Sequence, residues 1–198
     1  MPALPDDKHM DIVDRVCLEA VRSGFKVGAY ELLENIFKCE ELPMHCPYHH
    51  YVTAAVLVTS AGINASLEPE KITAMLKKAR ARASGIPGGI CGECGCCGAA
   101  VGVGIFADLW LGISPMSKEG WAIGNKMTAD ALYSIASAEG PRCCKRVSYL
   151  ALLSAVKDAH SIGADIGQLP EKITCTHFKK NRECKGVLCP FFKKGGKV

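Results

Sequence analysis

The segment Cys91-Gly-Glu-Cys94-Gly-Cys96-Cys97-Gly98 runs directly into the apolar stretch Ala99-Ala-Val-Gly-Val-Gly-Ile-Phe-Ala-Asp-Leu-Trp110. Glycines between the thiols permit backbone conformations with positive φ, so several sulfur atoms can converge on one point. The apolar stretch predicts a buried helix over residues 98–111. The cysteines are therefore expected at a helix N-terminus, where the macrodipole favours thiolates or a metal-bound anion.

Composition indicates one globular domain in a reducing compartment. The chain has 198 residues, of which 48% are hydrophobic. Its N-terminus resembles no secretory signal, and no apolar run is long enough to span a bilayer, so we expect a cytoplasmic protein without a membrane partner. Twelve cysteines in such a compartment are more typical of metal ligands or reactive thiols than of disulfides, although a disulfide knot is the simpler alternative.

Hydrophobic periodicity predicts helices along the whole chain, and no segment shows convincing strand alternation. The predicted fold is all-α: a single compact helical domain over residues 1–170, with a basic cysteine-rich tail over residues 171–198 packed on it. Besides the helix at 98–111, helices are expected at 10–22, around 33–37, from Pro47 to about Ala61, from Pro69 onward, from an N-cap at Ser117 to about Ala138, and at 147–160.

Two further clusters contain residues that can bind a metal or an anion or take part in catalysis. Cys46, His49 and His50 lie three and four positions apart, so one helical turn places them on one side. They predict either a metal site or a general base, with a structural histidine as the plain alternative.

In Arg142-Cys143-Cys144-Lys-Arg146, two thiols and three cations precede a predicted helix. That arrangement favours an anion or a thiol of low pKa, although a solvated basic turn is the alternative.

The tail carries a charge of +6, and the rest of the chain −2. Cys175-x8-Cys184-x4-Cys189-Pro is a metal-type arrangement, and a cysteine followed by proline is found among ferredoxin ligands. The spacing of these tail cysteines does not match a common zinc ribbon, which needs two tight Cys-x2-Cys pairs. We therefore expect a metal-tied tail whose lysines face water. Nucleic acid is not expected as the main ligand, and a protein partner is a second expectation.

Together, Cys-Gly-x-Cys-Gly-x-Cys-Gly-Ala-Ala-Val-Gly-Val-Gly, Gly-Pro-Arg-Cys-Cys-Lys-Arg and Cys-x8-Cys-x4-Cys-Pro-Phe-Phe resemble an uncharacterised cysteine-rich domain family of methanogenic archaea and other anaerobes. This resemblance covers most of the chain and brings no settled activity. It implies an anaerobic cytosol, in which oxygen-sensitive iron–sulfur clusters survive.

The stretch from Cys97 to Lys157 also resembles the α-domain of iron–sulfur L-serine dehydratases and the related cysteine desulfidases. In that family a cysteine opens a small-residue helix and a later Cys-x-x-Arg opens another, as Cys97 and Cys143 to Arg146 do here. The resemblance implies a 4Fe–4S cluster on three cysteines, whose open fourth iron binds substrate as a Lewis acid. Leu132 stands where the family has its remaining cysteine, so Cys144, Cys94 or a tail cysteine must replace it.

The motifs thus predict an iron–sulfur protein with a substrate-accessible cluster that handles sulfur in a desulfidase-like, lyase-like or sulfur-transfer role. The alternative is a non-catalytic zinc or iron–sulfur module for structural, electron-transfer or partner-binding roles. We expect Cys97 and Cys143 to share one site, although the four thiols of the central segment can also form a closed site alone. The candidate residues are the cluster ligands Cys91, Cys94, Cys96, Cys97, Cys143 and Cys144, the metal ligands Cys46, Cys175, Cys184 and Cys189, and the substrate- or proton-handling groups Glu93, His49, Arg142 and Arg146.

Overall fold

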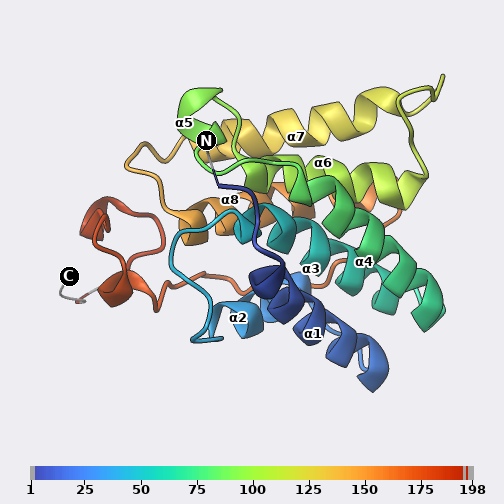
Figure 1. Cartoon of the computed structure of the whole chain (residues 1–198), viewed down its shortest axis with the longest axis horizontal. Coiled ribbons are helices and arrows are strands. Elements are labelled where there is room, and N and C mark those ends of the chain that lie inside the picture. The colour runs from blue at the N-terminus through green and yellow to red at the C-terminus, as the bar shows by residue number, and fades with distance from the viewer. Residues whose placement is uncertain (1–2, 194, 196–198) are drawn as a thin grey trace.

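The computed structural model describes residues 3–193 and 195, and within them it contains eight α-helices and no strand (Figure 1). This confirms the predicted all-α class. The α-helices are α1 (Asp7–Ser23), α2 (Ala29–Phe37), α3 (Tyr48–Asn64), α4 (Pro69–Ser84), α5 (Ile90–Glu93), α6 (Gly98–Leu111), α7 (Trp121–Ala136) and α8 (Cys144–Ala159). Three 3-10 helices follow: η1 (His160–Ile162), η2 (Phe178–Lys180) and η3 (Gly186–Leu188).

Helix α3 is the centre of the molecule. It packs against α1, α2, α4, α6 and α8, and all of its residues except His50 and Asn64 are buried. A helix that is apolar on every side must be covered on every side, and these five neighbours cover it. In the part of the chain that the structure describes, α3 and the other helices are all too short or too polar to traverse a bilayer.

Glycines allow α6 to lie unusually close to α3. A Cβ atom at Gly98 would lie 2.2 Å from the His50 ring, and one at Gly102 would lie 3.0 Å from the His50 carbonyl oxygen. Helix α6 therefore approaches α3 at distances that side chains would prevent. The prediction of a buried helix over 98–111 is confirmed, with Cys97 as its N-cap.

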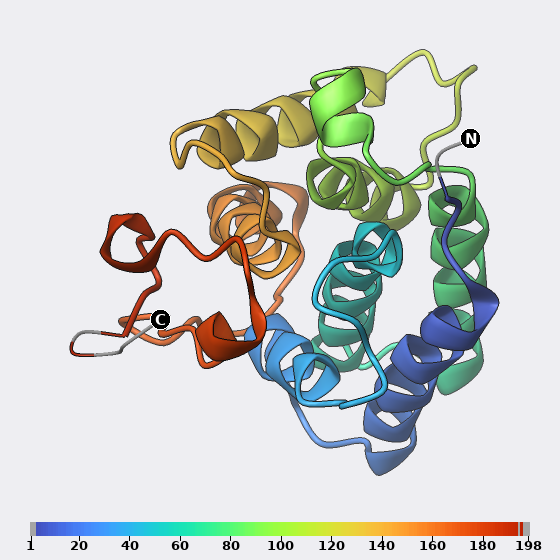
Figure 2. The same cartoon turned by 60° about the vertical axis from the view of Figure 1, so that its left-hand side comes forward.

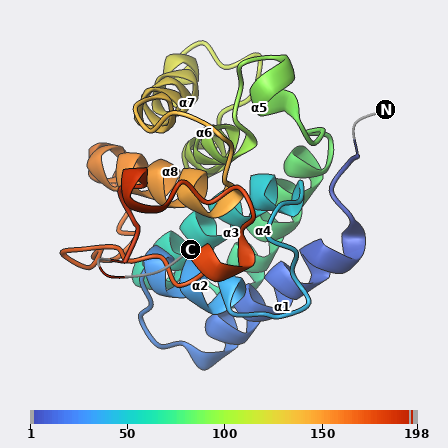
Figure 3. The same ribbon diagram turned by 90° about the vertical axis from the view of Figure 1, so that its left-hand side faces the viewer.

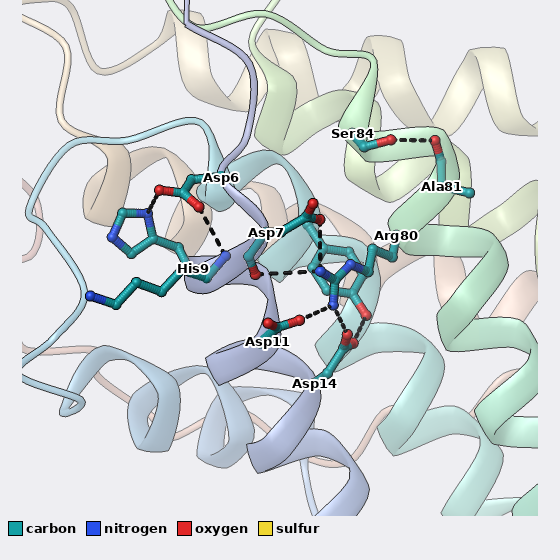
Figure 4. A network of polar contacts seen from close by, with 10 residues as sticks. Asp6, Asp7, His9, Asp11, Asp14, Arg80, Ala81 and Ser84 are labelled. Atoms are coloured by element: carbon teal, nitrogen blue, oxygen red, sulfur yellow. Dashed lines mark hydrogen bonds and ion pairs between the residues drawn. The ribbon is translucent and has the colours of Figure 1, made fainter.

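An ion-pair network joins α4 to α1. The Arg80 guanidinium lies 2.8 Å from Asp7 and 2.7 Å from Asp11, and it also contacts Asp14 (Figure 4). Tyr51 of α3 donates its hydroxyl to Asp14 from the other side. Asp7 and Asp11 are exposed, whereas Arg80 and Asp14 are largely shielded from solvent. The contacts of Asp14 with Arg80 and Tyr51 are therefore the part of the network that connects α1, α3 and α4 most firmly.

Helices α3, α6 and α8 all begin at the same end of the molecule, on the left in Figure 1. The tail lies at that end too, beside α8 and α2 (Figures 2 and 3). The ring centroid of Phe191 is 5.2 Å from that of Tyr149 in α8, and the His177 ring is 5.8 Å from Phe37 in α2. The tail therefore packs on the body through aromatic contacts.

Several predicted helix boundaries are wrong, and α1 already begins at Asp7, three residues before its predicted start. Helix α3 passes through Gly62, because the glycine makes room for Ile72 of α4, whose Cγ1 would lie 2.7 Å from a Cβ there. Helix α7 begins at Trp121, since the Ser117 hydroxyl accepts the Ser114 N–H at 2.9 Å within its own turn and caps no helix. Helix α8 begins three residues early, with Cys143 as its N-cap.

Candidate functional site

A cavity of about 450 Å³ lies where α3, α6 and α8 begin. The N-cap residues of all three helices, Pro47, Cys97 and Cys143, line it. Its rim includes the exposed residues Glu139 and Arg142, so the cavity opens to solvent. Three helix N-termini supply partial positive charge to this one cavity, which favours an anion there.

We call this cavity the larger cavity, to distinguish it from a smaller one beside the tail. Five thiols line it, and they come from four segments of the chain. Burial raises the pKa of Cys97. The backbone N–H groups of Ala99 and Ala100 hydrogen-bond to its sulfur and partly offset this increase. Burial likewise raises the pKa of Cys144 to about 12, although a hydrogen bond from the Cys46 backbone N–H lowers it in part. The metal-free thiols of Cys97 and Cys144 are therefore protonated at neutral pH, and a metal is the natural means of deprotonating them. The five are Cys46, Cys91, Cys97, Cys143 and Cys144.

Two histidines of α3 also line the larger cavity. The His49 side chain is buried, and its Nδ1 donates to the Cys46 carbonyl at 2.8 Å. This bond leaves Nε2 as an acceptor, which is buried and has no partner among the described residues. Burial, together with the charge of Lys145, holds the pKa of His49 well below its usual range. The His50 Nδ1 lies 3.1 Å from the Ile86 carbonyl.

The two arginines of the predicted site differ in environment. Arg142 is exposed at the rim of the larger cavity. Arg146 is 5% exposed and donates through Nη2 to the carbonyls of Glu139, at 2.8 Å, and Pro141, at 2.5 Å. Its Nε has no partner in the described part of the chain. Arg142 is thus free to meet an incoming anion, whereas Arg146 is held in place.

A second cavity, of about 20 Å³, lies between α8 and the tail. Four thiols line it: Cys143, Cys175, Cys184 and Cys189. The Asn181 side-chain amide donates to the Cys143 sulfur at 3.5 Å, and the His177 N–H donates to the Cys175 sulfur at 3.3 Å. Burial, together with the charges of the other three thiols, raises the pKa of Cys175 to about 11, and the His177 N–H opposes this change.

Lys145 is buried between the two groups of thiols. It is 2% exposed, its Nζ donates to the Tyr48 hydroxyl at 3.0 Å, and it lies 3.8 Å from the centroid of the Phe37 ring. Burial lowers its pKa to about 8, while Cys144, Cys143, Cys175 and Glu34 oppose that change. The described residues offer it no carboxylate within ion-pair distance.

Several predicted site residues lie elsewhere. Glu93 and Cys94 are exposed, Cys96 is half-buried, and none of the three lines either cavity. Cys91 belongs to the separate short helix α5, where its thiol reaches the larger cavity. Over the described residues, no three metal-ligating side chains are placed close enough to hold a single metal ion.

Sequence reasoning missed Glu139 as part of the site, and it did not single out Lys145 among the three cations of its segment. Their common place at a helix start does not tell which of them is buried, because that depends on how α8 packs on its neighbours. His50, which was expected together with Cys46 and His49, lines the larger cavity with them. Nothing in the local sequence marks Glu139, which reaches the cavity rim only through the packing of α7 on α6.

Comparison with known proteins identifies one related group. Residues 17–192 match the model of a family of unknown function, DUF5714. No curated protein and no solved structure matches the chain. The match spans α2 to α8, most of α1, and the tail, so both cavities lie within it.

Proposed function

The chain belongs to this family of unknown function, and we propose that it is an iron–sulfur protein whose cluster lies in the larger cavity and meets a small, anionic, sulfur-containing substrate. One observation carries the proposal: five thiols and the N-termini of three long helices converge on a cavity that opens to solvent. Soft thiolate donors select iron–sulfur clusters, and helix N-termini stabilise the negative charge of such a centre.

The ligands of this cluster are drawn from Cys46, Cys91, Cys97 and Cys144, which line only the larger cavity. Leu132, at the position of the remaining cysteine in the dehydratase-like pattern, lines the same cavity. The role of that cysteine as third cluster ligand therefore falls to one of the thiols that line the same cavity, Cys46, Cys91 or Cys144. When bound with three protein ligands, a 4Fe–4S cluster supplies Lewis-acid chemistry at its open iron.

Buried cations support an anionic centre. Lys145 and Arg146 are 2% and 5% exposed and lie beside the thiols. Buried charges without opposite partners are costly, and protonated thiols give no compensation. Thiolates bound to iron and sulfide would provide the missing negative charge, so the cations and the proposed cluster stabilise one another.

The remaining lining groups fit a small anion. Arg142 offers a guanidinium at the rim, which suits a carboxylate. Deeper in the site, the unpartnered Nε2 of His49 accepts a hydrogen bond from an amino or thiol group. A cavity of about 450 Å³ is in the size range of small-molecule sites. A buried electron relay needs no such volume, which favours substrate chemistry of the lyase or sulfur-transfer type.

The test is anaerobic reconstitution with ferrous iron and sulfide, followed by addition of L-cysteine as the probe. We expect a brown protein whose visible and electron paramagnetic resonance spectra shift with L-cysteine but not with L-alanine, which lacks the thiol. Cys97→Ala should lose the responsive signal. Cys39→Ala is the matched control, because that thiol lies outside both cavities.

Two results would contradict the proposal. One is a colourless protein that holds stoichiometric zinc at the larger cavity. The other is a cluster whose spectra ignore L-cysteine and whose iron content is the same in Cys97→Ala as in the unaltered chain.

A further inference from the structure

We infer that the smaller cavity is a second metal centre, a closed iron–sulfur cluster on the four thiolates of Cys143, Cys175, Cys184 and Cys189, which joins the tail to α8. This goes beyond the proposed function, which concerns only the larger, open cavity. The four thiols come from the start of α8 and from three points of the tail, and they line one small volume.

Two adjacent cysteines serve different cavities. The sulfur of Cys143 accepts the Asn181 amide of the tail, and Cys189 lies near enough to raise its pKa. By contrast, Cys144 is hydrogen-bonded by the Cys46 backbone and lies near Cys97. Although Cys143 also borders the larger cavity, its side-chain hydrogen bond is made to Asn181 of the tail. The Cys143-Cys144 pair therefore supplies one ligand to each centre.

The spacing of the four thiols favours a cluster over a single ion. Zinc–sulfur bonds of about 2.3 Å draw four sulfurs close together around one ion. Over the described residues, no three metal-ligating side chains lie close enough to hold a single ion. The four sulfurs therefore stand farther apart than a tetrahedral zinc requires, as the ligands of a cubane cluster do.

The surroundings suit a centre that is shut off from substrate. Aromatic rings line the smaller cavity, and four thiolates would occupy every iron of a 4Fe–4S cluster. Arg146 lines the cavity, and its unpartnered Nε can donate to a cluster sulfur. The lining aromatic residues are Tyr149, Phe178, Phe191 and Phe192.

The experiment compares iron and sulfide content in the anaerobically reconstituted full chain. With one cluster in each cavity we expect about eight irons per chain. Cys184→Ala and Cys189→Ala, made separately, should each lower this to about four, while the L-cysteine response of the remaining cluster is kept. Cys39→Ala should retain about eight, and circular dichroism of each variant verifies that its helices are folded.

Limited proteolysis gives a second measurement that does not depend on activity. The tail of the loaded protein should resist cleavage after residue 170, whereas Cys184→Ala should be cleaved there at least several-fold faster. Unchanged iron content and unchanged cleavage in both folded tail variants would overturn the inference, as would one equivalent of zinc that is lost only in those variants.

The two proposals fail in different ways. If Cys97→Ala loses all iron and Cys184→Ala loses none, the proposed function stands and the second centre does not exist. If Cys184→Ala loses all iron and Cys97→Ala loses none, the closed centre stands and the substrate-accessible cluster does not exist.

Discussion

Lys145 is a buried cation that has no carboxylate partner among the described residues, so its environment indicates what charge the site can hold. Its ammonium group donates to the Tyr48 hydroxyl, which in turn donates to the Pro43 carbonyl at 3.1 Å. The Phe37 face covers it. An aromatic face and a hydroxyl group only partly replace the lost hydration of an ammonium ion. The charge is therefore a cost in the metal-free protein and a benefit once anionic centres are bound nearby.

Replacing this lysine should therefore have opposite effects on the two forms of the protein. Lys145→Met should leave the metal-free protein as stable as before, or raise its free energy of unfolding by about 1–3 kcal/mol, because a buried charge is removed. It should also speed iron loss to a chelator by roughly tenfold, equivalent to about 1.4 kcal/mol. Urea unfolding and the rate of bleaching measure these effects.

The control is Lys157→Met, which removes an exposed lysine from the same helix. It should change neither quantity. A Lys145→Met protein that is less stable without metal, yet holds iron as firmly as the unaltered chain, would show that the ammonium group has a structural role only.

At the scale of elements, the contact between α3 and α6 positions the larger cavity. Gly98 is the first residue of α6 and lies against the His50 ring, while the preceding Cys97 faces the cavity. The same contact therefore sets both the distance between two helices and the direction of the Cys97 thiol. Small residues along α6 are needed because the buried α3 backbone lies directly against them.

Gly98→Ala should disturb this contact. The new Cβ would lie 2.2 Å from the His50 ring, which is held by its 3.1 Å hydrogen bond to Ile86. We expect the free energy of unfolding to fall by about 1–3 kcal/mol, as for other overpacked sites, and urea unfolding measures it. Adding His50→Ala should restore part of the loss, because it removes the ring.

The control for this substitution is Gly85→Ala, since nothing lies within 4 Å of a Cβ there and the φ of Gly85 is −82°. Equal stability of Gly98→Ala and Gly85→Ala would mean that α6 can move away from α3 without cost, and that the glycine does not hold the two helices in place.

At the scale of the whole molecule, the tail completes the core. The Cys175 N–H donates to the Phe191 carbonyl at 2.7 Å, which closes the tail on itself, and Phe191 is 6% exposed. The Lys185 ammonium donates to the Ala138 carbonyl at 3.0 Å, which ties the tail to the loop before α8. The body and the tail therefore share one hydrophobic core, which includes Phe191.

Phe191→Ala should destabilise the whole protein even without metal. Truncation of a buried phenylalanine costs about 3–5 kcal/mol, and the lost contact with Tyr149 should release the tail to proteases. Thermal unfolding and limited proteolysis measure the effect. Phe25→Ala, at a residue that is 79% exposed, should stay within about 0.5 kcal/mol of the unaltered chain. Matching values for the two variants would show that the tail contributes nothing to folding.

What the sequence by itself determined is local. Periodicity, prolines and capping positions predicted the all-α class, and the glycine-spaced thiols before an apolar run predicted Cys97 at the start of a buried helix. These features depend on neighbours within a few residues, so they can be recognised without a fold. The errors at Gly62 and Ser117 arose where a contact with another segment outweighed the local preference.

Only the tertiary structure decided which thiols share a cavity. Cys143 and Cys144 are adjacent in sequence, yet one contacts the tail and the other contacts the segment before α3. Cys94 belongs to the densest thiol cluster and nevertheless faces solvent. The direction of a side chain at a helix start depends on how that helix is rotated against its neighbours, and this rotation is set by packing between residues that are far apart in the sequence.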